Sequence, residues 1–187
     1  MTIQDYLRKS AGLIEEMAQA AATAQVEVVI EVITAAFRAN KILLVCGNGG
    51  SASDAMHIAG ELVGRFLKER PAQKCMALSA NPAVVTAWAN DYNYGTVLAR
   101  EVEAFGEAGG IFWGISTSGN SANVLAALAQ AKKMGMTTIG LTGQGGGKMA
   151  AMCDILIDVP SKETPFIQQI HICLYHYICQ KVEENLA

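Results

Sequence analysis

Three side chains with acid–base chemistry share one side of a segment that follows a glycine-rich turn. Asp54, His57 and Glu61 are spaced by three and four residues, so in a helix they project from one face. His57 and Glu61 then stand one turn apart and can reach the same proton, ligand or metal ion. The alternative is a solvated helix face, on which Asp54 pairs with His57 and Glu61 pairs with Arg65. Spacing alone favours this ordinary charged surface.

The turn that precedes this segment has the chemistry of an anion site. The apolar run over residues 41–46 is typical of a buried strand, and the turn G-N-G-G over residues 47–50 leads to Ser51. A strand, a glycine turn and a helix start place backbone N–H groups against an anion. The residues also fit G-x-G-x-x-A, but a dinucleotide site needs an acidic residue at the end of the next strand, and Glu69 lies in a charged turn before it.

A second loop gives a stronger anion signal. The segment S-T-S-G-N-S, residues 116–121, places four hydroxyls and a glycine between an apolar strand and a helix start. Helix capping by Ser118 or Ser121 would need only one hydroxyl. Four favour a phosphate, which hydroxyls and backbone N–H groups would hold because the loop has no Lys or Arg. By contrast, residues 143–149 miss the Walker pattern in spacing and in Met149, and predict a plain loop.

The last apolar segment brings polar side chains into a buried setting. A helix is predicted from Pro165 almost to the end of the chain, and its apolar residues lie all round the cylinder as far as Cys179. His171 on such a helix is more often a hydrogen-bonded core group than a ligand. Four polar residues from this helix and the earlier one would nevertheless form a mixed N/O site suited to zinc or a similar divalent ion: His57, Glu61, Gln168 and His176.

Alternating strands and helices must position these residues. Strands are predicted at residues 41–46, 75–79, 111–115, 137–142 and 155–159, and helices at 3–38, 51–66, 82–90, 96–105, 122–134 and from 165 onward. Strands that alternate with helices in this way form a parallel sheet with helices on both faces. No linker or repeat divides the sequence, so residues 1–187 are predicted to form a single α/β domain.

Composition excludes several classes of function. The chain has 187 residues, of which 51% are hydrophobic and 17% charged, so apolar surface buried between subunits is expected. A net charge of −3 gives no basic footprint for nucleic acid, and no apolar run reaches the ~18 residues of a membrane span. The N-terminus lacks the layout of a signal peptide, and the five cysteines include no C-x-x-C pair. We expect a cytoplasmic homo-oligomer with free thiols.

Several long motifs, in order from about residue 40 to the C-terminus, resemble the phosphoheptose isomerases of the wider sugar isomerase (SIS) domain family. They are C-G-N-G-G-S at residues 46–51, A-M-H at 55–57, N-D at 90–91, G-I-S-T-S-G-N-S-A-N-V at 114–124, G-K-M-A at 147–150 and I-Q-Q-I-H-I at 167–172. The resemblance implies a five-stranded parallel sheet sandwiched by helices. It also implies a homotetramer with active sites between subunits, where the helices over residues 3–38 pack.

The implied reaction is the aldose–ketose isomerisation of sedoheptulose 7-phosphate to D-glycero-D-manno-heptose 7-phosphate through an enediol. This reaction leads to activated heptose for lipopolysaccharide or other surface glycans. The resemblance assigns Glu61 as the base, in contact with substrate, and His176 as its acid partner. It assigns phosphate binding to Ser51, Ser116, Thr117, Ser118 and Ser121, sugar binding to Asn48, Gly49, Gly50, Asn90, Asp91 and Gln168, and one zinc ion per subunit to His57, Glu61, Gln168 and His176.

Three positions depart from the family pattern. Phe166 stands where the family usually has Arg, which removes a charge near the expected intersubunit site, Ala52 replaces a His of some members, and Gln169 replaces a common Glu. The alternative function is a SIS protein that binds phosphosugars without catalysis, or a DnaA-binding regulatory relative. Those relatives can lack the acid–base pair, so retention of Glu61 and His176 favours the enzyme. An isomerase for a different sugar phosphate would share the same site.

Overall fold

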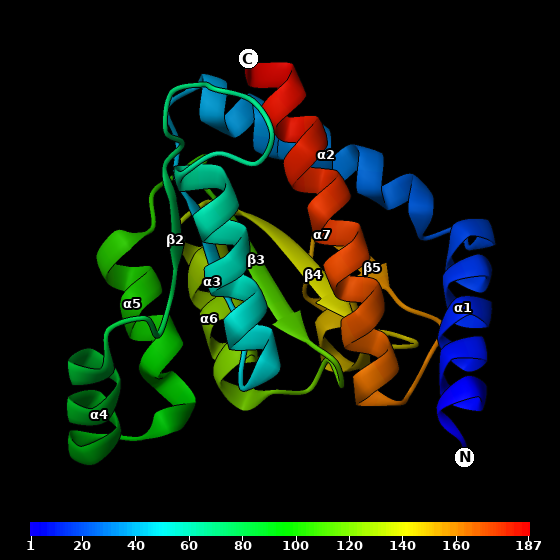
Figure 1. The fold of residues 1–187 in the computed structure, drawn as a ribbon. Coiled ribbons are helices and arrows are strands. Elements are labelled where there is room, and N and C mark those ends of the chain that lie inside the picture. The colour runs from blue at the N-terminus through cyan, green and yellow to red at the C-terminus, as the bar shows by residue number, and fades with distance from the viewer.

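Five short parallel strands form the centre of the computed structural model, which describes residues 1–187 (Figure 1). Their order in the sheet is β2-β1-β3-β4-β5. The bounds are β1 Leu43–Cys46, β2 Cys75–Ala77, β3 Ile111–Ser116, β4 Thr137–Thr142 and β5 Ile155–Asp158. The chain moves outward in one direction from β1 to β2 and in the other from β3 to β5. The reversal between β1 and β3 opens a crevice at their carboxyl ends, where α/β proteins bind ligands.

Helices cover both faces of the sheet, as the alternating pattern predicts. Their bounds are α1 Ile3–Gln19, α2 Thr23–Arg38, α3 Gly50–Val63, α4 Pro82–Asp91, α5 Val97–Phe105, α6 Ala122–Lys133 and α7 Thr164–Leu186, with short 3₁₀ helices η1 Tyr94–Thr96 and η2 Gly147–Ala151. Core residues of α2, α3 and α7, such as Ile33, Ile58 and Ile178, pack on one face. Val102 of α5 and Leu128 of α6 pack on the other.

The predicted elements are all present, and the differences lie at their ends. The region over residues 3–38 is two helices that meet at an angle of 71°, and only this bent pair, no single helix, has the length and apolar composition of a membrane span. The first long helix after the glycine turn ends at Val63 rather than at residue 66, because the backbone leaves the helical conformation at Gly64, where ψ is −115°. Arg65 therefore lies beyond the helix.

A buried ion pair holds the end of α3 against α7. The side chains of Arg70 and Glu183 are 0% and 1% exposed, with 3.4 Å between Nε and Oε1. Arg70 donates hydrogen bonds to the backbone carbonyls of Glu61 and Leu62, which have no partner within the helix. Glu183 accepts the backbone N–H groups of residues 66–68. Burial opposes the charge of Glu183, but these donors and Arg70 outweigh it and lower the pKa of the carboxyl.

Two of the three positions that depart from the family pattern dock α1 on the start of α7. The Phe166 ring is buried, its centroid lies 4.8 Å from that of Tyr6, and the Lys9 ammonium lies 4.6 Å above it. Gln169 donates a hydrogen bond to the Tyr6 hydroxyl at 2.8 Å, and Lys9 pairs with Glu163. Phe166 thus provides an aromatic contact between α1 and α7.

The Arg70–Glu183 pair makes a testable contribution to stability. Glu183→Gln leaves the Arg70 charge buried without a counter-ion, so we expect the free energy of unfolding to fall by about 3 kcal/mol in urea titrations at pH 7. Because the folded-state pKa of Glu183 is lowered, its contribution is complete above the ordinary value of 4.5 and is lost as the pH falls through the folded-state value. The gap between wild type and variant should therefore narrow in acid.

The matched control is Glu184→Gln, the next residue, whose partner Lys181 lies at the surface. Exposed pairs contribute little, so this variant should unfold at the same urea concentration as wild type. Equal losses for the two variants would contradict the assignment of the effect to the buried pair.

Candidate active site

A polar cleft of about 340 Å³ opens at the carboxyl ends of β1 and β3, where the strand order reverses. The two loops predicted to bind an anion supply most of its wall, and the first turn of α7 supplies the rest. Its lining is polar apart from one side chain: Asn48, Gly49, Gly50, Ser51, Ile115, Ser116, Thr117, Ser121, Thr164 and Gln168. Thr164 was not predicted, because a single Thr before a proline gives no signal of its own.

Glycines allow the first loop to close tightly against α7. Gly49 has φ +55°, a conformation that side chains disfavour. A Cβ on Gly50 would lie 2.6 Å from Gln168 Nε2, so the Gln168 amide occupies the space that a side chain at residue 50 would take. The N-terminus of α3 has no side-chain cap, and the N–H groups of residues 51–53 donate to the carbonyls of Asn48 and Gly49, so only the Gly50 N–H is left for a ligand.

The hydroxyls of the second loop face one another instead of capping the helix that follows. Ser121 precedes α6 and makes no capping hydrogen bond; its Oγ lies 2.9 Å from Ser116 Oγ. Ser118 accepts a hydrogen bond from the backbone of Asn120 and lies at the surface beside the cleft. Thr117 Oγ1 is 3.4 Å from Thr164 Oγ1 on α7. Capping therefore does not explain this serine-rich loop, and a cluster of hydroxyl donors suits a phosphate.

An amide pair joins the two loops. Asn48 and Asn123 exchange hydrogen bonds of 2.9 and 2.8 Å, and the Tyr94 hydroxyl donates to Asn48 Oδ1 at 2.9 Å. Asn123 is buried and also accepts the N–H of Val124 at the start of α6. Sequence reasoning placed Asn123 inside a motif without a role, and it missed Tyr94. The structure shows that both hold Asn48 at the edge of the cleft.

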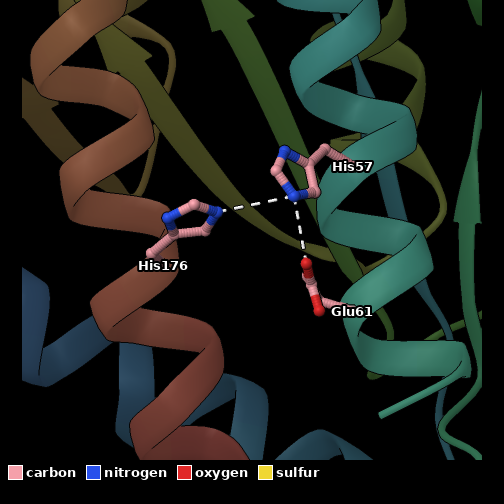
Figure 2. A group of neighbouring side chains, drawn as sticks. All are labelled: His57, Glu61 and His176. Atoms are coloured by element: carbon pink, nitrogen blue, oxygen red, sulfur yellow. Dashed lines mark hydrogen bonds and ion pairs between the residues drawn. The ribbon is translucent and has the colours of Figure 1, made fainter. Parts of the chain in front are cut away.

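His57, Glu61 and His176 converge between α3 and α7 (Figure 2). His57 Nε2 lies 3.0 Å from Glu61 Oε1 and 3.4 Å from His176 Nε2. The expected surface alternative is wrong for Glu61, because the carboxylate pairs with His57 and forms no ion pair with Arg65. Potential ligand atoms of the three residues lie within 4.8 Å of one another, so the cluster can hold a divalent metal ion through two imidazoles and one carboxylate.

Behind this cluster lies a half-buried carboxyl, that of Asp54. Tyr175 O–H reaches His57 Nδ1 at 2.9 Å and Asp54 Oδ1 at 3.4 Å. Burial raises the pKa of Asp54, against the lowering effects of the Tyr175 hydrogen bond and of His57. The expected direct contact between Asp54 and His57 is thus replaced by one that passes through Tyr175.

The remaining histidine is a core group, as its apolar surroundings predicted. His171 is fully buried and its Nε2 lies 3.1 Å from the carbonyl of Thr142 at the end of β4. Burial lowers the pKa of His171 to about 4, despite the opposing effect of this hydrogen bond. The ring is therefore neutral at pH 7, and it joins α7 to the sheet.

The predicted substrate residues fall in three places. Gln168 lies in the cleft with both loops, whereas Glu61 and His176 lie farther along α3 and α7 and do not line the cleft. Asn90 and Asp91 are exposed at the end of α4, where Asn90 donates a hydrogen bond to Asp91. A single chain does not bring these two to the cleft, and their role stays a prediction.

Comparisons with known proteins identify relatives over most of the chain. Residues 5–143 match the SIS domain family. The phosphoheptose isomerase of Crocosphaera subtropica is 51% identical over 84% of this chain and 80% of its own length. That of Desulfovibrio desulfuricans is 48% identical over 99% of this chain and 90% of its own.

Solved structures give the same result. The phosphoheptose isomerase GmhA of Neisseria gonorrhoeae has a TM-score of 0.92 at 36% identity, and the alignment covers 97% of each chain. A phosphoheptose isomerase from Francisella tularensis has a TM-score of 0.94 at 32% identity, with coverage of 98% of this chain and 100% of that one.

The hydroxyl cluster predicts a measurable affinity for phosphate. Ser121→Ala removes one donor of the loop, and a hydrogen bond to a charged group is worth about 1.5–3 kcal/mol, so inorganic phosphate should bind at least about tenfold more weakly by calorimetry. Ser53→Ala, at an exposed position of α3 outside the cleft, is the control and should bind as wild type does. Equal phosphate affinity in Ser121→Ala would exclude this hydroxyl from the anion site.

Proposed function

The chain belongs to the phosphoheptose isomerases of the SIS domain family, and we propose that it converts sedoheptulose 7-phosphate to D-glycero-D-manno-heptose 7-phosphate. The observation that carries the proposal is an acid–base cluster on the same two helices, α3 and α7, that help to line the hydroxyl-rich cleft. His57 follows Gly50 by seven residues in α3, which is about 10 Å at ~1.5 Å per residue. That separation suits an extended sugar whose phosphate and reacting carbons lie at opposite ends.

In the proposed reaction, Glu61 is the base. Its carboxylate removes a proton from C1 of the ketose and returns it to C2, by way of a 1,2-enediol. His176 serves the two oxygens: the O2 carbonyl gains a proton and the O1 hydroxyl loses one, so that no proton is gained or lost overall. Both groups lie in the cluster of Figure 2, within reach of one small ligand.

Zinc is the metal that we propose for the cluster, one ion per subunit. Two imidazoles and a carboxylate are a common donor set of catalytic zinc sites, and the resemblance adds the Gln168 amide. A bound zinc ion would stabilise negative charge on the oxygens of the enediol. A carboxylate that binds zinc is a weaker base, so the metal and base roles of Glu61 belong to different states.

The rest of the substrate is assigned by the cleft and by the resemblance together. We assign the phosphate to the hydroxyls of both loops: Ser51, Ser116, Thr117, Ser118 and Ser121. The sugar then extends from the cleft along α3 and α7 toward Glu61. It is expected to contact Asn48, Gly49, Gly50, Asn90, Asp91 and Gln168.

We propose a homotetramer in which neighbouring subunits cover the His57–Glu61–His176 cluster. The His57 side chain is 41% exposed in a single chain, whereas an enediol must be kept from water. Apolar side chains are also exposed on the outer side of α1 and on α7: Ile3, Leu7, Ile14, Ile172 and Tyr177. The last helix was expected to be buried on all sides, and one chain buries only one of its faces. A second copy would cover the rest.

The product would enter heptose biosynthesis for lipopolysaccharide or other surface glycans. All five cysteines are free, which fits the reducing conditions of the cytoplasm that we propose as its location. The alternative of a SIS protein without catalysis is not favoured, because the chain assembles the acid–base groups that a binding protein does not need.

The base assignment predicts the outcome of one substitution. Glu61→Gln keeps the shape of the side chain and removes its basicity, so the rate of aldose formation from sedoheptulose 7-phosphate should fall at least about 100-fold. The control is Glu69→Gln, at an exposed position in the turn that follows α3, which should keep the wild-type rate. A wild-type protein that forms no aldose would favour the binding alternative, and a fully active Glu61→Gln would refute the mechanism.

The assembly proposal predicts a change of molecular mass in solution. Leu7→Glu places a charge on the exposed apolar side of α1, so the protein should elute as a smaller species than wild type in size-exclusion chromatography with light scattering. Arg8→Glu, one residue on and facing solvent, should leave the mass unchanged. A wild-type protein of monomer mass would contradict the proposal outright.

A further inference from the structure

Tyr175 lies at the point where the acid–base cluster meets the hydrophobic core. It precedes His176 on α7 and is fully buried. Its hydroxyl lies 2.9 Å from His57 Nδ1, and the other ring nitrogen of His57 faces Glu61 Oε1 at 3.0 Å. The imidazole therefore has one nitrogen in the cluster and one nitrogen on Tyr175.

Asp54 completes a chain of three polar groups. Its Oδ1 accepts from the Tyr175 hydroxyl at 3.4 Å, and its Oδ2 is buried with no hydrogen-bond partner. A buried oxygen without a partner costs stability, so packing alone does not explain this carboxyl. It does provide an acceptor behind Tyr175.

If His57 binds a cation, the hydrogen bonds among His57, Tyr175 and Asp54 can run in only one direction. Metal binding needs a lone pair on Nε2, which places the ring proton on Nδ1. Nδ1–H then donates to the Tyr175 oxygen, and Tyr175 O–H donates to Asp54, which as a carboxylate can only accept. Metal-binding histidines generally have such a partner on the second nitrogen, and it fixes the tautomer and the direction of the ring.

Ring contacts add a second restraint. The Tyr175 ring meets His57 edge-on, at 73° and 5.4 Å between centroids, and meets His176 at 81° and 5.0 Å. One side chain thus touches both imidazoles of the cluster on the side away from solvent.

We propose that Tyr175, backed by Asp54, is a positioning residue that holds His57 with Nε2 toward Glu61 and His176. It thereby sets the affinity of the cluster for a divalent cation. The inference rests on the metal site proposed above and deepens it, because it names residues outside the donor set that determine whether the site is filled.

The test is zinc binding, measured by competition with a chromophoric chelator. Tyr175→Phe keeps the ring and removes the hydroxyl, and we expect it to bind zinc about 10–100-fold more weakly than wild type. Tyr177→Phe is the matched control: it lies two residues away on α7, its hydroxyl points to Glu27, and its zinc affinity should be unchanged. Asp54→Asn should weaken zinc binding too. In the double variant Asp54→Asn/Tyr175→Phe, the loss of zinc affinity should not exceed the sum of the losses of the two single variants.

Kinetics separate positioning from a general structural role. Tyr175→Phe should have a reduced kcat at limiting zinc, restored by excess zinc, with KM for the sugar phosphate unchanged because the phosphate loops lie elsewhere. Zinc affinity equal to wild type in Tyr175→Phe overturns the inference, as does a wild-type protein that binds no zinc. If Tyr175→Phe fails to fold, Asp54→Asn decides by the same measurement. A wild-type protein that binds zinc but forms no aldose refutes the isomerase and leaves this inference standing.

Discussion

The packing of α7 against α3 is the contact on which the site depends. Neither helix holds the acid–base cluster alone, since His57 and Glu61 come from α3 and His176 from α7 (Figure 2). Three different contacts fix the pair along its length. At one end the Gln168 amide lies against Gly50. In the middle the Tyr175 hydroxyl contacts His57 and Asp54. At the far end Arg70 and Glu183 form a buried ion pair.

The hydrogen bonds of Arg70 and Glu183 explain why this position holds a buried ion pair rather than apolar side chains. Charges without water cost free energy, and hydrophobic replacements are often neutral or stabilising. Here Arg70 also satisfies the last carbonyls of α3, and Glu183 orders the chain that leaves it at residues 66–68. A slip of α7 by one residue would move His176 by about 1.5 Å, enough to separate it from His57. A polar clamp with fixed donors specifies this register better than apolar surface does.

Features that lie within one short stretch could be predicted from the sequence. The strands, most helices and both polar loops follow from local patterns, and the hydroxyls of Ser116, Thr117 and Ser121 do line the cleft. Spacing misjudged Glu61, because an early end of α3 at Gly64 carries Arg65 away from it. From the sequence alone, Tyr175 on an apolar helix is interpreted as a core residue, and Arg70 and Glu183 are interpreted as surface charges. Their roles depend on which helix lies beside which, and no local pattern encodes that.

The Tyr175 hydroxyl has two acceptors within reach, His57 Nδ1 and Asp54 Oδ1, which suit a metal-free and a metal-bound state of the cluster. In the tautomer in which His57 Nε2–H donates to Glu61, Nδ1 accepts from the Tyr175 hydroxyl at 2.9 Å, and Asp54 Oδ1 at 3.4 Å is the second acceptor for the same hydroxyl. In the proposed metal-bound state the ring proton would lie on Nδ1, and the hydroxyl would donate to Asp54 Oδ1 instead. Oδ1 is the acceptor that this state would need, whereas Oδ2 has no hydrogen-bond partner. In this proposal Glu61 would change as well, from the partner of an imidazole N–H to a metal ligand, so Tyr175 and Asp54 behind His57 would bias the choice between a free base and a metal-bound carboxylate.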